Sequence, residues 1–252
     1  MMLKWHLPFY QEIFTISHFL QDPILTFGYQ GIEKQAPAGA NPFVPRLRRL
    51  LASEAKMRRL VKFARSSLKW SASVPKDFQY DSLTDLLISR GHSTTTLDYF
   101  DGRADLRYDM NRPVPEFEHN KYGTLIDIGC LEHLFDTAGC LENCIRMVRR
   151  GGYYLLHTPV NGYFGHGLHV FNPQGLIDCF VANGLKIVYL KYSTYKGKPI
   201  SDPSKSRNVI LWLVGKKEED APIFVCPQQK IWATDYYSPS AALSSPATAC
   251  LG

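Results

Sequence analysis

Short apolar runs alternate with helical patterns over much of this chain, and that alternation constrains the fold more than any other feature. The runs "YGTLIDIG", "YYLLHTP", "LKIVYLKY" and "NVILWLVGKK" predict strands. Between the first two, "TAGCLENCIRMVRRGG" predicts a helix ended by a glycine pair, and Pro173 to Asn183 predicts another with Asn172 as its N-cap. Strands separated by helices favour an α/β domain with a mainly parallel sheet covered on both faces.

The N-terminal half adds further elements of the same kind. "DPILTFG", "STTTLDYF" and "ADLRYD" predict short strands, and "DSLTDLLISRG" predicts a helix with Asp81 or Ser82 as N-cap and Gly91 just past its end. We therefore expect an N-terminal helix over residues 1–22, one domain over 23–220, and an extension over 221–252. The small, polar residues at the end of that extension are typical of disorder.

Composition fits one large soluble domain. The 252 residues are 45% hydrophobic and 21% charged, and the formal net charge is +6. This mild charge does not by itself indicate nucleic-acid binding, no nucleic-acid-reading motif occurs, and no apolar run reaches the length needed to span a bilayer. The apolar start is interrupted by polar residues, which favours a helix over a signal peptide. Six cysteines without a CxxC pair are expected to be free thiols, with the cytoplasm as the default compartment.

A basic amphipathic helix is predicted from Pro45 to Trp70, within the domain. Its apolar residues recur at steps of three and four, and its other face carries nine Lys or Arg against the single acid Glu54. One interpretation is a solvated face that keeps the protein soluble. The other is a lid or docking surface for an anionic acceptor, such as a phosphorylated sugar or a carrier-bound intermediate.

Candidate site residues follow the predicted strands. Asp98 and Asp109 end two of them, Gly129 ends a third, and the fourth runs into a loop that contains His166 and His169. In an open parallel sheet, ligands bind outside the carboxyl ends of the strands, where strand order reverses. Taken singly, such aspartates more often shape turns. The two loop histidines have no third ligand nearby in the sequence, so no metal site is expected.

The order of these motifs resembles class I S-adenosylmethionine-dependent methyltransferases. The similarity is greatest to a bacterial group with a glycine-arginine-glutamine loop after its first strand. That group also has an acidic strand end, a "YD-N" element, a "GTLEH" element and a "TP-N-N-x-x-GHG" loop. The corresponding stretches here are "FGYQ" at 27–30, Asp98, "YDMN" at 108–111, "GCLEH" at 129–133 and "TPVNGYFGHG" at 158–167. Tyr29 stands where that group has arginine.

The resemblance implies a Rossmann-like, doubly wound sheet whose final strand is antiparallel, and S-adenosylmethionine as cofactor. The cofactor contacts it implies are Gly28, Tyr29, Gln30, Asp98, Asp109, Met110, Gly129 and Glu132. A base near the methyl group would be His166 first and His133 second, since histidine suits proton removal near neutral pH. His157 lies inside a strand pattern, which favours packing.

The resemblance also implies methylation at oxygen or nitrogen of a small-molecule or glycan acceptor in a biosynthetic pathway. Two alternatives stay open. One is a non-catalytic fold that serves a partner enzyme or scaffold, and the other is an enzyme that binds the cofactor for a different reaction. Cofactor binding without a methylated product would favour the latter, and absence of binding the former.

Overall fold

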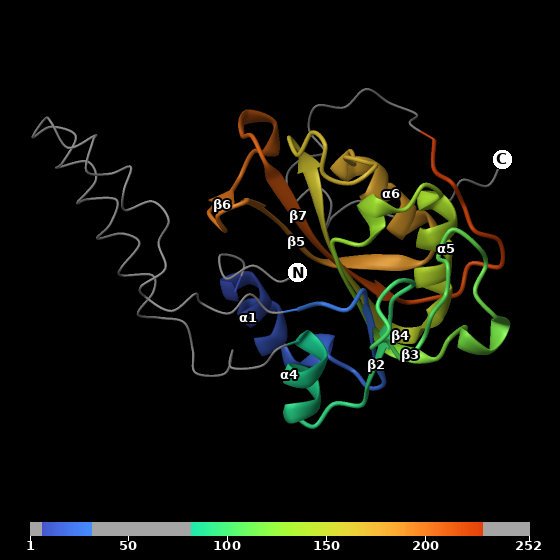
Figure 1. Cartoon of the computed structure of the whole chain (residues 1–252). Coiled ribbons are helices and arrows are strands. Elements are labelled where there is room, and N and C mark those ends of the chain that lie inside the picture. The colour runs from blue at the N-terminus through green and yellow to red at the C-terminus, as the bar shows by residue number, and fades with distance from the viewer. Residues whose placement is uncertain (1–6, 32–81, 229–252) are drawn as a thin grey trace, which may run out of the picture.

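One seven-stranded sheet forms the centre of the molecule. The computed structural model describes residues 7–31 and 82–228, and within them the strand order is β2-β1-β3-β4-β7-β5-β6 (Figure 1). The first four strands in this order run parallel, and β7 is antiparallel to both β4 and β5. The strands are β1 (Ile24–Phe27), β2 (Thr94–Leu97), β3 (Tyr122–Ile128), β4 (Val148–Asn161), β5 (Leu185–Thr194), β6 (Pro199–Ile200) and β7 (Val209–Lys217). The predicted α/β, Rossmann-like fold with an antiparallel last long strand is confirmed.

Helices cover both faces of this sheet. α5 (Thr137–Met147) and α6 (Pro173–Ala182) pack on one face, and α1 (Leu7–Thr15) and α4 (Leu83–Ser89) lie on the other (Figure 1). Phe9 of α1 stacks on Trp212 of β7 at 4.7 Å between ring centroids, which fixes α1 to the sheet. Single-turn 3₁₀ helices are η2 (Ser17–Phe19), η3 (Glu116–Glu118), η4 (Leu131–His133) and η5 (Pro203–Lys205).

The helix starts follow the capping signals in the sequence. The Ser82 side chain accepts the backbone N–H of Asp85 at the start of α4, so Ser82, rather than Asp81, is the N-cap. Asn172 caps α6 in the same way, with Pro173 at the first helical position. These side chains satisfy N–H groups that have no partner within the helix.

Two predicted elements differ from the structure. The "ADLRYD" stretch makes only an isolated bridge between Leu106 and Leu97, because the Asp105 carboxylate accepts the N–H of Thr96 at 2.8 Å in place of a further backbone carbonyl. The helix before β4 ends at Met147 and not at the glycine pair, which lies inside β4. A Cβ at Gly152 would lie 2.6 Å from the carbonyl oxygen of Gly123, so the pair permits a close strand contact.

Some of the predicted features fall outside the described residues. The basic helix from Pro45 to Trp70 does so entirely, and so does the C-terminal extension from residue 229 onward. In the part of the chain that the structure describes, no helix has the length and apolar character needed to cross a membrane.

The strand order places a topological switch point between β1 and β3. From β1 the chain proceeds to β2 on one side, and then returns to β3 on the other side of β1. The carboxyl ends of these two strands diverge into separate loops, an arrangement that leaves room for a ligand in open α/β sheets. The candidate residues Gly28 and Gly129 directly follow these two strand ends.

Candidate functional site

Gly28 directly follows β1 and has a backbone conformation that favours glycine. Its φ is +81°, and its N–H donates to the carbonyl of Leu97 at 2.7 Å. A Cβ at this position would lie 2.4 Å from Sγ of Cys130 and 2.6 Å from Nε2 of Gln30. The space beside Gly28 is therefore taken by two side chains of the protein itself.

Gln30 holds this loop closed from inside. Its side chain is buried, and its Nε2 donates to the carbonyl of Phe27 at 3.1 Å and to Sγ of Cys130 at 3.3 Å. The Cys130 thiol in turn donates to the carbonyl of Phe27 at 3.0 Å. These contacts fasten the loop after β1 to the loop after β3, across the switch point.

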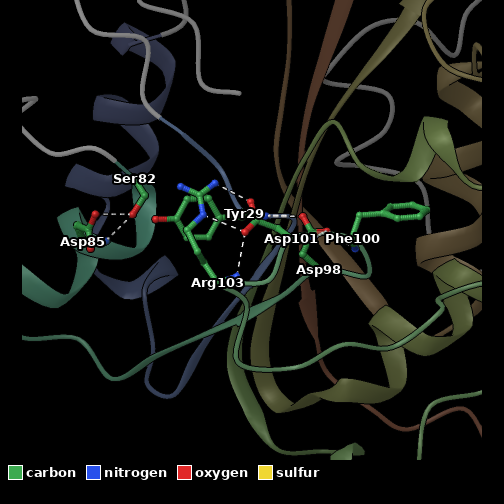
Figure 2. A network of polar contacts seen from close by, with 7 residues as sticks. All are labelled: Tyr29, Ser82, Asp85, Asp98, Phe100, Asp101 and Arg103. Carbon is green, nitrogen blue, oxygen red and sulfur yellow. Dashed lines mark hydrogen bonds and ion pairs between the residues drawn. The ribbon is translucent and has the colours of Figure 1, made fainter.

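Asp98 organises the adjoining loops through three backbone N–H groups. Its Oδ2 accepts the N–H of Tyr29 at 2.9 Å, and its Oδ1 accepts those of Phe100 at 2.9 Å and Asp101 at 3.0 Å (Figure 2). A carboxylate offers about four acceptor positions, so about one is left for a ligand. Asp98 thus has the turn-shaping role that strand-end aspartates commonly have, and keeps capacity for a single hydroxyl.

Tyr29 carries a guanidinium group over its ring. The Arg103 side chain lies 3.7 Å from the ring centroid and forms a two-pronged pair with Asp101, with hydrogen bonds of 2.9 and 2.6 Å (Figure 2). Those hydrogen bonds lower the pKa of Asp101 to about 2. A guanidinium group paired with Asp101 therefore lies at this loop, although Tyr29 replaces the arginine of the similar bacterial group.

Asp109 and Met110 belong to the connection between β2 and β3. The Asp109 carboxylate accepts the backbone N–H and the side-chain amide of Asn111, which lowers its pKa. The Asn111 oxygen accepts the N–H groups of Phe135 and Asp136, so this connection is tied to the start of α5. Met110 is 2% exposed and packs in the core, so its side chain is not presented to a ligand.

Glu132 is a buried carboxylate held at the edge of the sheet. It is 1% exposed, and its Oε2 accepts the hydroxyl of Thr158 at 2.9 Å. A Cβ at Gly129 would come within 3.0 Å of Oε1, so this glycine leaves room for the carboxylate. Burial raises the pKa of Glu132, partly offset by its hydrogen bonds.

The histidine-bearing loop folds back over Glu132. The backbone N–H groups of Leu168 and His169 donate to the Glu132 carbonyl at 2.7 and 3.1 Å. Gly167 has φ +73°, and a Cβ there would lie 2.8 Å from that carbonyl oxygen. This close approach explains a glycine beside His166.

His166 and His133 come together beside the Glu132 carboxylate. Nε2 of His166 lies 3.9 Å from Oε1 of Glu132, and the rings of His133 and His166 are 5.1 Å apart and nearly perpendicular. Partial desolvation of the exposed His133 ring lowers its pKa, which favours its neutral, proton-accepting form. His157, by contrast, packs between Tyr10 and Trp212, as the sequence predicts for a strand residue.

Asp127 lies beneath this edge with no exposed surface. Burial, with the nearby Glu132 carboxylate as a lesser cause, raises its pKa well above the ordinary range, although its Oδ1 accepts the N–H of Cys130. The folded chain therefore keeps a proton on Asp127 at pH values where the unfolded chain has lost it. Stability is consequently expected to fall as pH rises above about 4, the ordinary pKa of aspartate.

Replacing Asp127 by Asn removes this proton uptake and keeps an oxygen acceptor for Cys130. We expect the free energy of unfolding of Asp127→Asn to change less between acidic and neutral pH than that of the parent. Urea denaturation at a series of pH values measures this. The pKa of Glu132 is also raised, so some pH dependence of the free energy of unfolding is expected to remain in the variant. If the variant and the parent have the same pH dependence, Asp127 is ionised in the folded protein.

The structure thus gathers most sequence-predicted residues at one edge, around the switch point. Met110 is the exception, being buried in the core, and Asp109 reaches the edge only through Asn111. Sequence reasoning missed the neighbours that hold these residues: Cys130, Arg103, Asn111 and Thr158. Cys130, Asn111 and Thr158 lie in the stretches that resemble the family's motifs, but the partners of all four residues are distant in the chain, so no local pattern assigns them these contacts.

Two hollows in the described surface lie elsewhere. One of about 260 Å³ is lined by His119, Arg146 and Lys217, near the amino end of β3. The other, of about 230 Å³, lies between the first turns of α5 and α6 and is lined by residues such as Leu141 and Phe171. Because ligands of open α/β sheets bind at the carboxyl ends of strands, we place the candidate site at the switch point and not in either hollow.

No model of a protein family matches the sequence, and no curated protein matches it either. Among solved structures, the chain is similar to a Burkholderia thailandensis 1,6-didemethyltoxoflavin-N1-methyltransferase with bound S-adenosylhomocysteine. The identity is 14%, with 74% of this chain and 94% of that one covered, and the TM-score is 0.40.

It is also similar to a putative methyltransferase from Bacillus halodurans, at 11% identity, 54% and 86% coverage and a TM-score of 0.40. A further similar structure is a possible histamine N-methyltransferase from Thermotoga maritima, at 11% identity, 53% and 67% coverage and a TM-score of 0.33. At these identities and TM-scores, the likeness assigns no activity and no residue role to this chain.

Proposed function

We propose that the protein transfers a methyl group from S-adenosylmethionine to oxygen or nitrogen of a small-molecule or glycan acceptor. One observation carries the proposal: Gly28, Asp98 and Gly129 converge on the switch point of a Rossmann-like sheet. This is where nucleotide-like cofactors bind in such sheets. The ordered motifs that resemble class I methyltransferases lie on the same strand ends.

In this proposal the cofactor's ribose is held by the remaining acceptor position of Asp98. The backbone of Tyr29 and Gly129 flanks the methionine part, with Gln30 supporting the loop from below. Methyl transfer from a sulfonium is an in-line displacement whose donor is already activated, so the protein mainly holds donor and acceptor in line. His166, or else His133, takes the proton that the acceptor loses.

Exposed aromatic side chains support a ring-bearing acceptor. Phe100, Phe135 and Phe164 are 86%, 82% and 105% exposed, and they follow the carboxyl ends of β2, β3 and β4. Aromatic side chains offer flat apolar surface against which a sugar or an aromatic ring can stack. This surface fits a small molecule or glycan, including one attached to a carrier.

A second candidate function is a repurposed fold that performs no methyl transfer. The observation in its favour is the filled space beside Gly28, where Cys130 and Gln30 lie against the backbone that a cofactor would approach. In this case the loop after β1 packs against the protein's own side chains and leaves no space for a cofactor. The protein would then bind a partner protein or act as a scaffold and would not catalyse a reaction.

The two functions separate in a turnover experiment. The full chain is incubated with S-adenosylmethionine and a panel of sugars, nucleotide sugars and phenolic or amino compounds, and formation of S-adenosylhomocysteine is measured. The proposal expects acceptor-dependent product above the level without acceptor. Binding of the cofactor without product from any acceptor class would favour a different reaction, and absence of both would favour the repurposed fold.

A further inference from the structure

Three potential metal ligands meet at the carboxyl edge of the sheet. Within the described residues, one ligand atom each from Glu132, His133 and His166 lies within 4.8 Å of the others. Oε1 of Glu132 and Nε2 of His166 are 3.9 Å apart. This set differs from the pair of His166 and His169 that the sequence offers, because Glu132 and His133 precede His166 by more than thirty positions along the chain.

The carboxylate of this cluster is fixed before any ion binds. Thr158 holds Oε2, and the N–H groups of Leu168 and His169 hold the backbone carbonyl of Glu132. Gly129 and Gly167 leave the space in which the carboxylate lies. Its other oxygen, Oε1, is the one that faces His166. Because this ligand and its loop are already ordered, less conformational entropy is lost when a metal ion binds.

The two imidazoles are the adjustable part of the cluster. The side chain of His166 is 56% exposed, and His133 is exposed as well. Ligands at about 2.1 Å from a tetrahedral ion are roughly 3.4 Å apart, so a separation of 4.8 Å closes by small rotations of these exposed rings. A buried carboxylate without a cation is costly as an anion, and a bound cation offsets that cost.

We propose that Glu132, His133 and His166 form a binding site for a divalent transition-metal ion. Two imidazoles and one carboxylate are ligands that zinc, cobalt and iron accept, and they leave coordination positions open. Magnesium and calcium prefer oxygen ligands, so the site is expected to discriminate against them. The metal site depends only on these three side chains, so metal binding does not require that the protein transfer methyl groups.

A bound ion changes the chemistry of the proposed reaction. It occupies both imidazoles, which then no longer act as bases. An acceptor hydroxyl placed on an open coordination position has its pKa lowered by the ion and releases its proton to solvent more readily. The C–S bond of the donor then breaks as the new C–O bond forms. This consequence rests on the proposed function, whereas the binding does not.

Cobalt titration tests the site directly. The full chain without a polyhistidine tag is treated with chelator, dialysed, and titrated with Co²⁺ while the visible absorption of the bound ion is recorded. We expect saturation at one Co²⁺ per chain, displacement by Zn²⁺, and no displacement by Mg²⁺ at the same concentration. No cofactor or acceptor is present, so the result is independent of methyl transfer.

Variants assign the ligands. His133→Asn and His166→Asn should each weaken Co²⁺ binding by at least about 10-fold. Changes to groups that only hydrogen-bond to a metal ligand already lower metal affinity by about 10–100-fold. Glu132→Gln should do the same, and thermal unfolding shows whether this buried variant folds. His119→Asn, at a histidine far from the cluster, and His169→Asn, in the same loop, should bind as the parent does.

The two histidine variants change exposed side chains, so they stay informative if Glu132→Gln does not fold. The proposal is overturned if the parent binds no Co²⁺ at one ion per chain. It is also overturned if His133→Asn and His166→Asn both bind Co²⁺ as tightly as the parent, or if His119→Asn or His169→Asn abolishes binding.

Discussion

Replacing Lys217 by Met is expected to lower the free energy of unfolding by about 1–3 kcal/mol, the range for leaving buried acceptors without a donor. Lys217 ends β7 and is 2% exposed. Its ammonium donates to the side chain of Asn120 at 2.9 Å and to the carbonyls of Ile145 and Val148 at 3.0 and 2.8 Å. Met matches the length of the lysine stem but has no donor, so it leaves these acceptors without their partner.

This network joins three separate parts of the chain where α5 ends and β3 and β4 begin. Asp220 also pairs with Lys217 at 2.7 Å, but its side chain is 52% exposed, so Asp220→Ala should cost less than about 1 kcal/mol. Lys216→Met, at the adjacent and less buried lysine, is the matched control and should stay within about 0.5 kcal/mol of the parent. Urea denaturation measures all three. If the free energy of unfolding of Lys217→Met falls by less than about 1 kcal/mol, water hydrogen-bonds to these acceptors in place of the ammonium.

Replacing Asp98 by Ala is expected to weaken S-adenosylhomocysteine binding by about 5- to 150-fold, equivalent to 1–3 kcal/mol. Two losses contribute to this effect. The ribose loses its carboxylate acceptor, and the N–H groups of Tyr29, Phe100 and Asp101 lose the group that orders their loops. Both loops border the proposed cofactor site.

Asp178→Ala is the matched control, because Asp178 lies on α6 and accepts only from Gln174 in the described hydrogen bonds. Calorimetric titration of both variants measures the effect, with thermal unfolding as the check on folding. If Asp98→Ala remains folded and binds S-adenosylhomocysteine as tightly as the parent, Asp98 only shapes a turn.

The fold was predictable from the sequence because its signals are local. Apolar runs such as "NVILWLVGKK" and capping residues such as Asn172 act within a few positions, and both correspond to elements of the structure. The prediction failed in two places, where the outcome depended on contacts with a neighbouring strand. The Asp105 carboxylate took the place of a backbone partner in a predicted strand, and the chain turned from α5 directly into β4 before its glycine pair.

The candidate site was predictable only as a set of strand ends. Periodicity places Asp98 and Gly129 at one edge, since the carboxyl ends of parallel strands lie together. It does not reveal that Gln30 and Cys130 fill the space beside Gly28, or that Thr158 fixes Glu132. Those contacts join residues separated by 100 and 26 positions, so they depend on the register of the assembled sheet.

The central claim is that the switch point between β1 and β3 binds an adenosylated cofactor, and calorimetric titration of the full chain with S-adenosylhomocysteine tests it most directly. The account predicts saturable binding of one molecule per chain, competition by S-adenosylmethionine, and the same affinity in Asp178→Ala. Absence of binding heat, together with an unfolding temperature unchanged at high ligand concentration, would contradict the account and leave the contact of Cys130 and Gln30 with Gly28 as a closed structural feature.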